Sequence, residues 1–265
     1  MEPEVVTHDG RRTAYRRTDF GGGGPTVLYV HGSGGNRGVW VRQYGWREHP
    51  GPAVALDLSG HGESEDVTTP PGPETLDAYA DDAVAVAREV GADVLVGNSL
   101  GGAVVQRVAL DRSDDLDLAA LVLCGTGAKL GVVDPLKDAL ATDFEGAIET
   151  LHGEDMLFHD ADAEARAASE AAMRETGRAV TERDFLTCDA FDVRGRLGDL
   201  DAPCLAVTGE HDRLTPVAFH EYLAERLPDC DLSVVPDAAH LSMVEASAAW
   251  NAALAEFLDG RVERA

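Results

Sequence analysis

The sequence predicts an α/β protein with a doubly wound, mostly parallel sheet that begins with an antiparallel hairpin. Short, unbroken apolar runs alternate along the chain with long segments of helical character, and a hairpin motif precedes them. Such runs are typical of strands buried on both faces of a parallel sheet, and strands that alternate with helices give a doubly wound sheet. After the hairpin, the predicted strands span residues 26–30, 53–56, 94–96, 118–124, 204–207 and 232–235.

The hairpin is predicted at the N-terminus. Two extended runs, residues 5–8 and 11–17, flank Asp9 and Gly10. An Asp-Gly pair tolerates the positive φ angles that a tight turn between antiparallel strands requires. The sheet should therefore begin with two antiparallel strands.

The helices are marked by apolar side chains at the 3.6-residue period. The clearest stripe consists of Leu76, Tyr79, Ala80, Ala83, Val84 and Ala87. From about residue 126 to 201 no strand is obvious, whereas Phe144, Ile148 and Leu151 mark another helical face. We therefore expect a helical insertion, residues 126–201, over one end of the sheet, within a single domain of residues 1–265.

The charge balance is strongly acidic. The chain has 48 acidic and 22 basic residues, a net charge of −26 that is spread along the sequence, and Lys129 and Lys137 are its two lysines. This balance argues against a nucleic-acid partner. Because lysine is usually among the commonest residues, its scarcity favours adaptation to high salt. An ordinary acidic cytosolic enzyme is the alternative interpretation.

Cysteine usage and hydropathy indicate a soluble, cytoplasmic protein without a membrane partner. The longest apolar run, residues 118–124, is too short to cross a bilayer, and no signal-peptide pattern opens the chain. The cysteines have no paired spacing, so we expect free thiols, no metal site and no cofactor. They are Cys124, Cys188, Cys204 and Cys230.

Residues 97–101, Gly-Asn-Ser-Leu-Gly, fit a nucleophile on a sharp strand-to-helix turn. An apolar run precedes this segment and a plausible helix start follows it. A serine in such a turn has strained backbone angles, and side chains two positions to either side would collide with the neighbouring backbone, which explains the glycines. We therefore interpret Ser99 as a candidate nucleophile rather than as a helix cap.

A nucleophilic serine needs a base, and the base needs a carboxylate that fixes its tautomer. Asp212 and His240 follow the two last predicted strands, whose ends should converge with that of Ser99. Glu210 is the alternative acid, and Asp237 lies close before His240. His211 adjoins Asp212 too closely to be its partner. The other candidate bases are expected on the surface: His8, His49, His152, His159 and His220.

Attack on a carbonyl carbon also requires backbone N–H groups that bind the resulting oxyanion. Leu100, directly after the candidate nucleophile, should supply one of them. The glycine-rich loop after the strand at residues 26–30 should supply the other, from Ser33 or, alternatively, from Gly34.

Five segments together resemble the successive signatures of the α/β-hydrolase superfamily. They are His-Gly-Ser-Gly-Gly at residues 31–35, Asp-Leu-Ser-Gly-His-Gly-Glu-Ser at 57–64, Gly-Asn-Ser-Leu-Gly-Gly at 97–102, Gly-Glu-His-Asp at 209–212 and Ala-His at 239–240. The resemblance implies the α/β-hydrolase fold, Asp212 rather than Glu210 as the acid, and a structural role for His61. It also implies that the insertion is a helical cap between the sixth and seventh core strands.

The resemblance further implies acyl chemistry. A serine at the nucleophile position argues against relatives that need aspartate there, the haloalkane dehalogenases and epoxide hydrolases. We expect hydrolysis of a small carboxylic ester or lactone through an acyl-enzyme, with the acyl substrate and water as partners. Carbon–carbon bond hydrolysis, enol-lactone opening and the perhydrolase reaction of cofactor-free haloperoxidases are alternatives, as is a ligand-binding receptor on the same fold. The sequence does not give the oligomeric state.

Apolar residues of the expected cap are candidates for lining the acyl pocket. We select Leu157, Phe158, Phe185 and Phe191. The alternative is that these side chains only pack the insertion onto itself.

Overall fold

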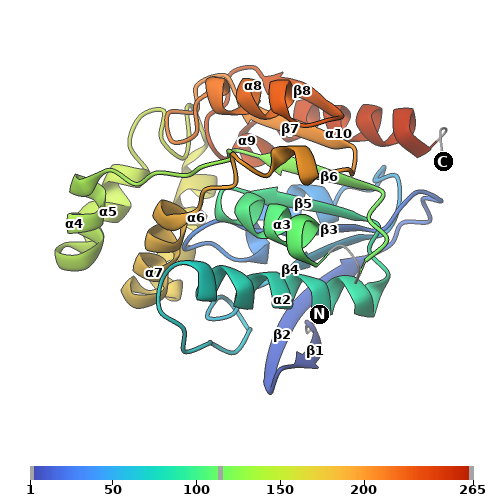
Figure 1. The fold of residues 1–265 in the computed structure, drawn as a ribbon. Coiled ribbons are helices and arrows are strands. Elements are labelled where there is room, and N and C mark those ends of the chain that lie inside the picture. The colour runs from blue at the N-terminus through green and yellow to red at the C-terminus, as the bar shows by residue number, and fades with distance from the viewer. Residues whose placement is uncertain (1–2, 113–115, 263–265) are drawn as a thin grey trace.

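One mostly parallel sheet runs through the protein, whose computed structural model describes residues 3–112 and 116–262. Within these residues, eight strands pair in the order β1-β2-β4-β3-β5-β6-β7-β8 (Figure 1). The pairings of β2 with β1 and β4 are antiparallel and the others are parallel. The predicted fold class is therefore confirmed. The strands are β1 (Glu4–His8), β2 (Arg11–Thr18), β3 (Val27–Val30), β4 (Ala53–Leu56), β5 (Val94–Asn98), β6 (Ala120–Cys124), β7 (Cys204–Gly209) and β8 (Cys230–Val235).

The first two strands form the predicted hairpin. Glu4 pairs with Tyr15 and His8 with Arg11, so two residues, Asp9 and Gly10, connect the strands. Both have positive φ angles, 47° and 76°. This backbone conformation matches the twist of the flanking strands, which is why Asp-Gly is found at this turn.

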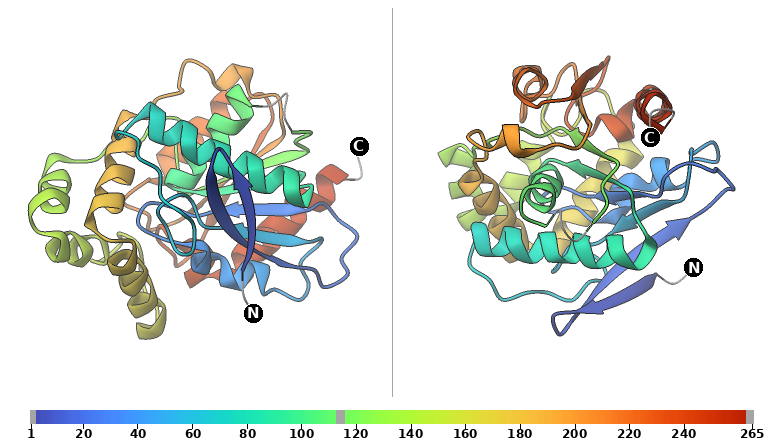
Figure 2. Two further views of the ribbon diagram at one scale, coloured as in Figure 1. Left: turned by 90° about the horizontal axis from the view of Figure 1, so that it is seen from below. Right: turned by 45° about the vertical axis from the view of Figure 1, so that its right-hand side comes forward.

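Helices cover both faces of the sheet, as Figure 2 shows. Residues alternate between two apolar cores along the central strands: Leu28 of β3 packs in one core and Tyr29 in the other. Double burial of these strands is therefore confirmed. One face carries α2 (Pro73–Val90), α3 (Leu100–Asp111) and α8 (Val217–Arg226), and the other carries η1 (Arg37–Trp40), α1 (Val41–Tyr44), α9 (Ser242–Glu245) and α10 (Ser247–Val262).

The last strand differs from the prediction. Residues 232–235 were expected to be buried on both faces, but Leu232 and Val234 are 41% and 40% exposed. The reason is that β8 is the edge strand of the sheet and, among the described strands, pairs only with β7. An apolar run of this length does not distinguish an edge strand from a central one.

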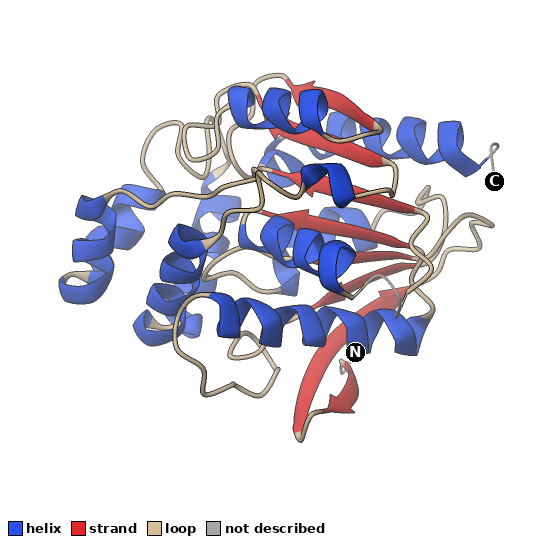
Figure 3. Cartoon of the chain, viewed as in Figure 1, coloured by secondary structure: helices blue, strands red, loops and turns tan. Residues whose placement is uncertain are grey.

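Four α-helices and a short η-helix lie between β6 and β7. Figure 3 shows the four α-helices on the side towards which the arrowheads of the parallel strands point. The helices are α4 (Asp134–Thr142), α5 (Phe144–Leu151), α6 (Ala163–Thr176), α7 (Arg178–Ala190) and η3 (Leu197–Asp199). Met173 of α6 and Cys188 of α7 are buried.

In residues 3–112 and 116–262 the cysteines form no disulfide bond, and Cys124, Cys188 and Cys204 are buried. Within residues 3–112 and 116–262, no helix is both long enough and apolar enough to span a membrane.

Candidate active site

Ser99 lies on a sharp turn between β5 and α3. Its φ angle is +55° and its ψ angle −117°, a conformation that residues with a side chain rarely adopt. A Cβ atom added to Gly97 would lie 2.1 Å from the Gly101 oxygen, and one added to Gly101 would lie 2.3 Å from the Val30 oxygen. Glycine is therefore required on both sides of Ser99, as the sequence suggested.

Asp212 and His240 follow β7 and β8 and are in direct contact. The His240 Nδ1 atom lies 2.9 Å from Asp212 Oδ2. The same oxygen accepts the Thr215 hydroxyl at 2.8 Å, and Oδ1 accepts the N–H groups of Leu214 and Thr215 at 2.9 and 2.8 Å. Because its partner is a carboxylate, Nδ1 of neutral His240 carries the proton, which leaves Nε2 free to accept one.

Charge and hydrogen bonding keep Asp212 ionised despite its burial. Burial acts to raise the pKa of the carboxyl, but the attraction of His240 and the hydrogen bonds from His240 and Thr215 outweigh it, so the pKa lies below its ordinary value. Asp212 is therefore a carboxylate at neutral pH.

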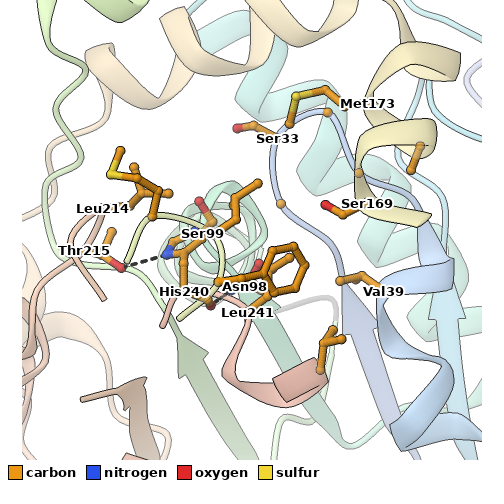
Figure 4. A pocket seen from close by; sticks show the side chains of 18 of the residues that line it. Ser33, Val39, Asn98, Ser99, Ser169, Met173, Leu214, Thr215, His240 and Leu241 are labelled. Carbon is orange, nitrogen blue, oxygen red and sulfur yellow. Dashed lines mark hydrogen bonds between the residues drawn. The ribbon is translucent and has the colours of Figure 1, made fainter. Parts of the chain in front are cut away.

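Ser99 and His240 line the same cavity, which has a volume of about 750 Å³ (Figure 4). Its wall combines the loop after β3 with residues from the helices between β6 and β7, including Ser169 and Met173. Among the residues predicted for the pocket, Leu157, Phe158 and Phe185 line this cavity.

Phe191 does not line the cavity, and its selection as a pocket residue was wrong. It is buried in the core that α2 and α3 form with the sheet, beside Leu76 and Pro73. Phe191 follows the last residue of α7, where the chain has turned back towards the sheet. An aromatic residue at the end of a helix gives no sequence signal for this change of direction.

The candidate oxyanion donors lie beside Ser99. Leu100 is the first residue of α3, so its N–H has no acceptor within the helix. In residues 3–112 and 116–262, the Ser33 N–H likewise has no acceptor. The Gly34 N–H, the alternative donor, is instead bonded to Asp184 Oδ2 at 2.9 Å.

Three histidines that were predicted on the surface are buried: His49, His152 and His220. Each makes a hydrogen bond that the sequence pattern does not indicate. His220 Nε2, for example, accepts the Thr126 N–H at 3.0 Å, and burial lowers the pKa of His220 to about 4. It is therefore an uncharged structural group at neutral pH. His8 and His159 are partly exposed.

Three residues around the site, Thr215, Asn98 and Asp184, were not predicted from the sequence. Asn98 Nδ2 lies 3.5 Å from the His240 backbone oxygen and thus links β5 to the loop after β8. Asp184 has a weak signal in the sequence, because it lies three residues after Thr181 and four before Cys188, on the buried face of α7.

Comparison with known proteins agrees with this architecture. The model of the Alpha/beta hydrolase family matches residues 27–253. The chain belongs to this family. The fold and the hydrolase class predicted from the sequence are therefore confirmed.

This hydrolase is similar to proteins named as esterases and as a lactonase. The pimeloyl-acyl-carrier-protein methyl ester esterase of Neisseria meningitidis serogroup A is 30% identical over 248 residues, which are 88% of this chain and 77% of that protein. The 3-oxoadipate enol-lactonase 2 of Acinetobacter baylyi is 25% identical and covers 87% of each chain. A solved structure of a thermophilic esterase is 33% identical, with a TM-score of 0.83 over 98% of each chain.

Proposed function

We propose that Ser99, His240 and Asp212 form a catalytic triad that hydrolyses a small carboxylic ester or lactone. The observation that carries the proposal is the contact between the buried Asp212 carboxylate and Nδ1 of His240, a residue that lines the same cavity as Ser99. This contact leaves His240 Nε2 as a base, and the strained turn at Ser99 presents a hydroxyl to the same space.

The reaction proceeds in two halves. Ser99 Oγ attacks the carbonyl carbon while His240 takes its proton, and the tetrahedral intermediate then expels the alkoxide, which His240 protonates. His240 next removes a proton from water, whose oxygen attacks the acyl carbon. The bond from that carbon to Ser99 Oγ then breaks, His240 returns the proton to Ser99 Oγ, and the acid is released. With a lactone the alcohol and the acid belong to one product. Asp212 stabilises the imidazolium that forms in each half.

The backbone N–H groups of Ser33 and Leu100 bind the oxyanion. The position of Leu100 at the start of α3 supports its role, because amides at a helix start are unpaired and favour negative charge. The bond of Gly34 N–H to Asp184 favours Ser33 over Gly34 as the second donor.

The insertion between β6 and β7 acts as a cap that selects the acyl group. Apolar side chains of this segment, among them Leu157, Phe158 and Phe185, line the cavity that contains Ser99. A wall of this kind suits an apolar acyl chain. The names of the relatives support both an ester and a lactone as substrate.

The enzyme is also adapted to high salt. Its net charge of −26 leaves many carboxylates without a cationic partner, and the 22 basic residues include two lysines. Ion pairs on the surface are formed mainly by arginine, such as Arg107 with Asp77 and Arg196 with Asp111. The remaining carboxylates repel one another unless salt screens them.

A panel of activated acyl esters, lactones and vinylogous diketones tests the function. We expect turnover of esters or lactones with a rapid first burst of alcohol when deacylation is the slower half. Cleavage of the diketones alone would replace the proposal with carbon–carbon bond hydrolysis. Binding of these compounds without turnover of any would instead indicate a receptor.

A further inference from the structure

A second His–Asp pair is buried behind the loop that carries Ser33. The His61 Nε2 atom lies 2.8 Å from Asp184 Oδ2, and both side chains are fully buried. Asp184 accepts two further hydrogen bonds, from the Gly34 N–H to Oδ2 at 2.9 Å and from the Tyr79 hydroxyl to Oδ1 at 2.7 Å. One carboxylate thus holds three donors in the interior.

The hydrogen bonds define the charge of this pair. His61 Nδ1 lies 3.1 Å from the Ser59 backbone oxygen, and Nε2 faces the carboxylate, so both nitrogens face acceptors. Both must then carry a proton, which makes His61 an imidazolium and Asp184 its counter-ion. The pKa of His61 is raised although burial opposes it, because the attraction and hydrogen bond of Asp184 outweigh the loss of water.

Asp184 connects four segments that are distant in the sequence. Gly34 belongs to the loop after β3, His61 to the loop after β4, Tyr79 to α2, and Asp184 itself to α7 of the insertion. A second contact joins α7 to the same loop, because Ser33 Oγ lies 3.6 Å from Cys188 Sγ. Helix α7 is therefore bonded to the residues on either side of the Ser33–Gly34 peptide.

We propose that Asp184 is a positioning residue for the oxyanion hole. The inference rests on the proposed function. The carboxylate holds the Gly34 N–H away from the cavity and so fixes the peptide plane between Ser33 and Gly34. The adjacent Ser33 N–H then stays directed at the oxyanion before substrate binds. Because Asp184 lies on α7, the hole has its full geometry only while the insertion is in place.

Asparagine at position 184 cannot replace the carboxylate. Its amide has one acceptor oxygen and no charge. If the NH₂ group faces Gly34 and His61, it meets two donors; if it faces Tyr79, the hydroxyl can turn and accept from it, but the neutral oxygen then holds the Gly34 N–H more weakly than a carboxylate does. The Gly34 peptide then loses its fixed orientation or His61 loses its counter-ion. A displacement of about 1 Å in catalytic groups can cost on the order of 100-fold in rate. We expect Asp184→Asn to lower kcat by about 10- to 100-fold and to change KM by less than about 2-fold, because the ground state does not use the hole.

The experiment compares Asp184→Asn with Asp189→Asn. Asp189 also lies on α7 and also accepts a backbone N–H, that of Val132 at 2.9 Å, but within residues 3–112 and 116–262 it forms no hydrogen bond or ion pair with the Ser33 loop. For both variants kcat and KM are measured with 4-nitrophenyl butyrate, the inhibition constant with butylboronic acid, and folding by thermal melting. Butylboronic acid forms a tetrahedral adduct with a serine and places an oxygen in the hole.

The proposal expects Asp184→Asn to lose kcat and boronate affinity by similar factors while Asp189→Asn retains both. A folded Asp184→Asn protein with unchanged kcat and boronate affinity overturns it, as does an effect confined to KM. If Ser99→Ala retains full activity, the proposed function itself has failed, which is a different result.

A measurement on the unaltered protein covers the case in which Asp184→Asn does not fold. Amide resonances are recorded by NMR with and without butylboronic acid. The Ser33 and Leu100 amides should shift strongly on binding, whereas the Gly34 amide, held by Asp184, should shift little and exchange slowly with solvent. A larger shift at Gly34 than at Ser33, or rapid exchange of the Gly34 amide, contradicts the proposal.

Discussion

The His240 Nδ1 atom faces Asp212 Oδ2 at 2.9 Å, although 28 residues separate the two in the sequence. They meet because β7 and β8 are parallel neighbours whose carboxyl ends lie at one edge of the sheet. Thr215 strengthens the contact, since its hydroxyl and its N–H both bond to Asp212. The imidazole is thereby held in the tautomer that a general base requires.

Replacing Asp212 and Glu210 one at a time should show which of the two carboxylates supports His240. Asp212→Asn removes the charge that stabilises the imidazolium and should lower kcat by on the order of 10⁴-fold, as the same change does in a serine protease. Glu210→Gln should change kcat by less than about 2-fold, because surface substitutions away from a site have small effects and Glu210 is exposed. Steady-state kinetics on both variants provide the measurement. A greater loss in Glu210→Gln would show that the wrong acid had been named.

The buried His61–Asp184 pair should make stability depend on pH. The pKa of His61 is raised in the folded protein, so its contribution is fully present below the unfolded value of 6.5 and is lost as pH rises through the folded pKa. Asp184 is the main cause of the shift, whereas Arg183 opposes it. His31, the adjacent ring, has its pKa lowered by burial to about 3 and is uncharged.

His61→Gln isolates this contribution, since glutamine keeps a donor for Asp184 but does not titrate. Denaturant unfolding of both proteins at constant salt should show a gap in stability that is largest near pH 6 and narrows towards pH 9. A gap that stays constant across this range would mean that His61 is not charged in the fold.

Phe185 should influence the preferred acyl length, because it lines the cavity that contains Ser99. Phe185→Ala enlarges the cavity and should move the optimum of a 4-nitrophenyl ester series towards longer acyl chains. Phe191→Ala is the matched control, since Phe191 lies in the core outside this cavity. It should cost about 3–5 kcal/mol of stability and leave the optimum unchanged. Identical chain-length profiles in all three proteins would exclude Phe185 from the acyl pocket.

The sequence predicted the parts of the protein that depend on local pattern. The apolar runs at residues 94–96 and 204–207 are strands, the Asp9-Gly10 turn is a hairpin, and the glycines around Ser99 are needed for close packing. Each of these features is determined by residues that are close together in the sequence. Family signatures then indicated where the candidate acid and base would follow their strands.

The parts that failed depend on contacts between distant segments. Burial of His220 results from packing of α8 against β7, and its bond to Thr126 spans 94 residues. Phe191 is the first residue after α7 and packs into the core rather than into the cavity. Asp184 accepts hydrogen bonds from three other segments. In the sequence, however, a single acidic residue on a helix looks like a solvent-exposed one. Neither the spacing of apolar residues nor a short motif in a single sequence indicates such long-range contacts.

Salt should stabilise the enzyme far beyond the physiological range. At 0.01 M the Debye length is about 30 Å, so a net charge of −26 destabilises the compact state through repulsion, and at 1 M it falls to about 3 Å. Thermal melts from 0.05 to about 3 M KCl should show a Tm that rises throughout, with little activity at the dilute end. A Tm that is flat above about 0.15 M, with full activity in dilute buffer, would indicate an ordinary acidic enzyme.

Covalent labelling is the decisive measurement of whether Ser99 is the nucleophile. A fluorophosphonate probe reacts with an activated serine and remains attached through tryptic digestion and mass spectrometry. We expect one adduct, on the peptide that contains Ser99, together with complete loss of both labelling and ester hydrolysis in Ser99→Ala. An adduct on a different serine, or hydrolysis that persists in Ser99→Ala, would contradict this assignment.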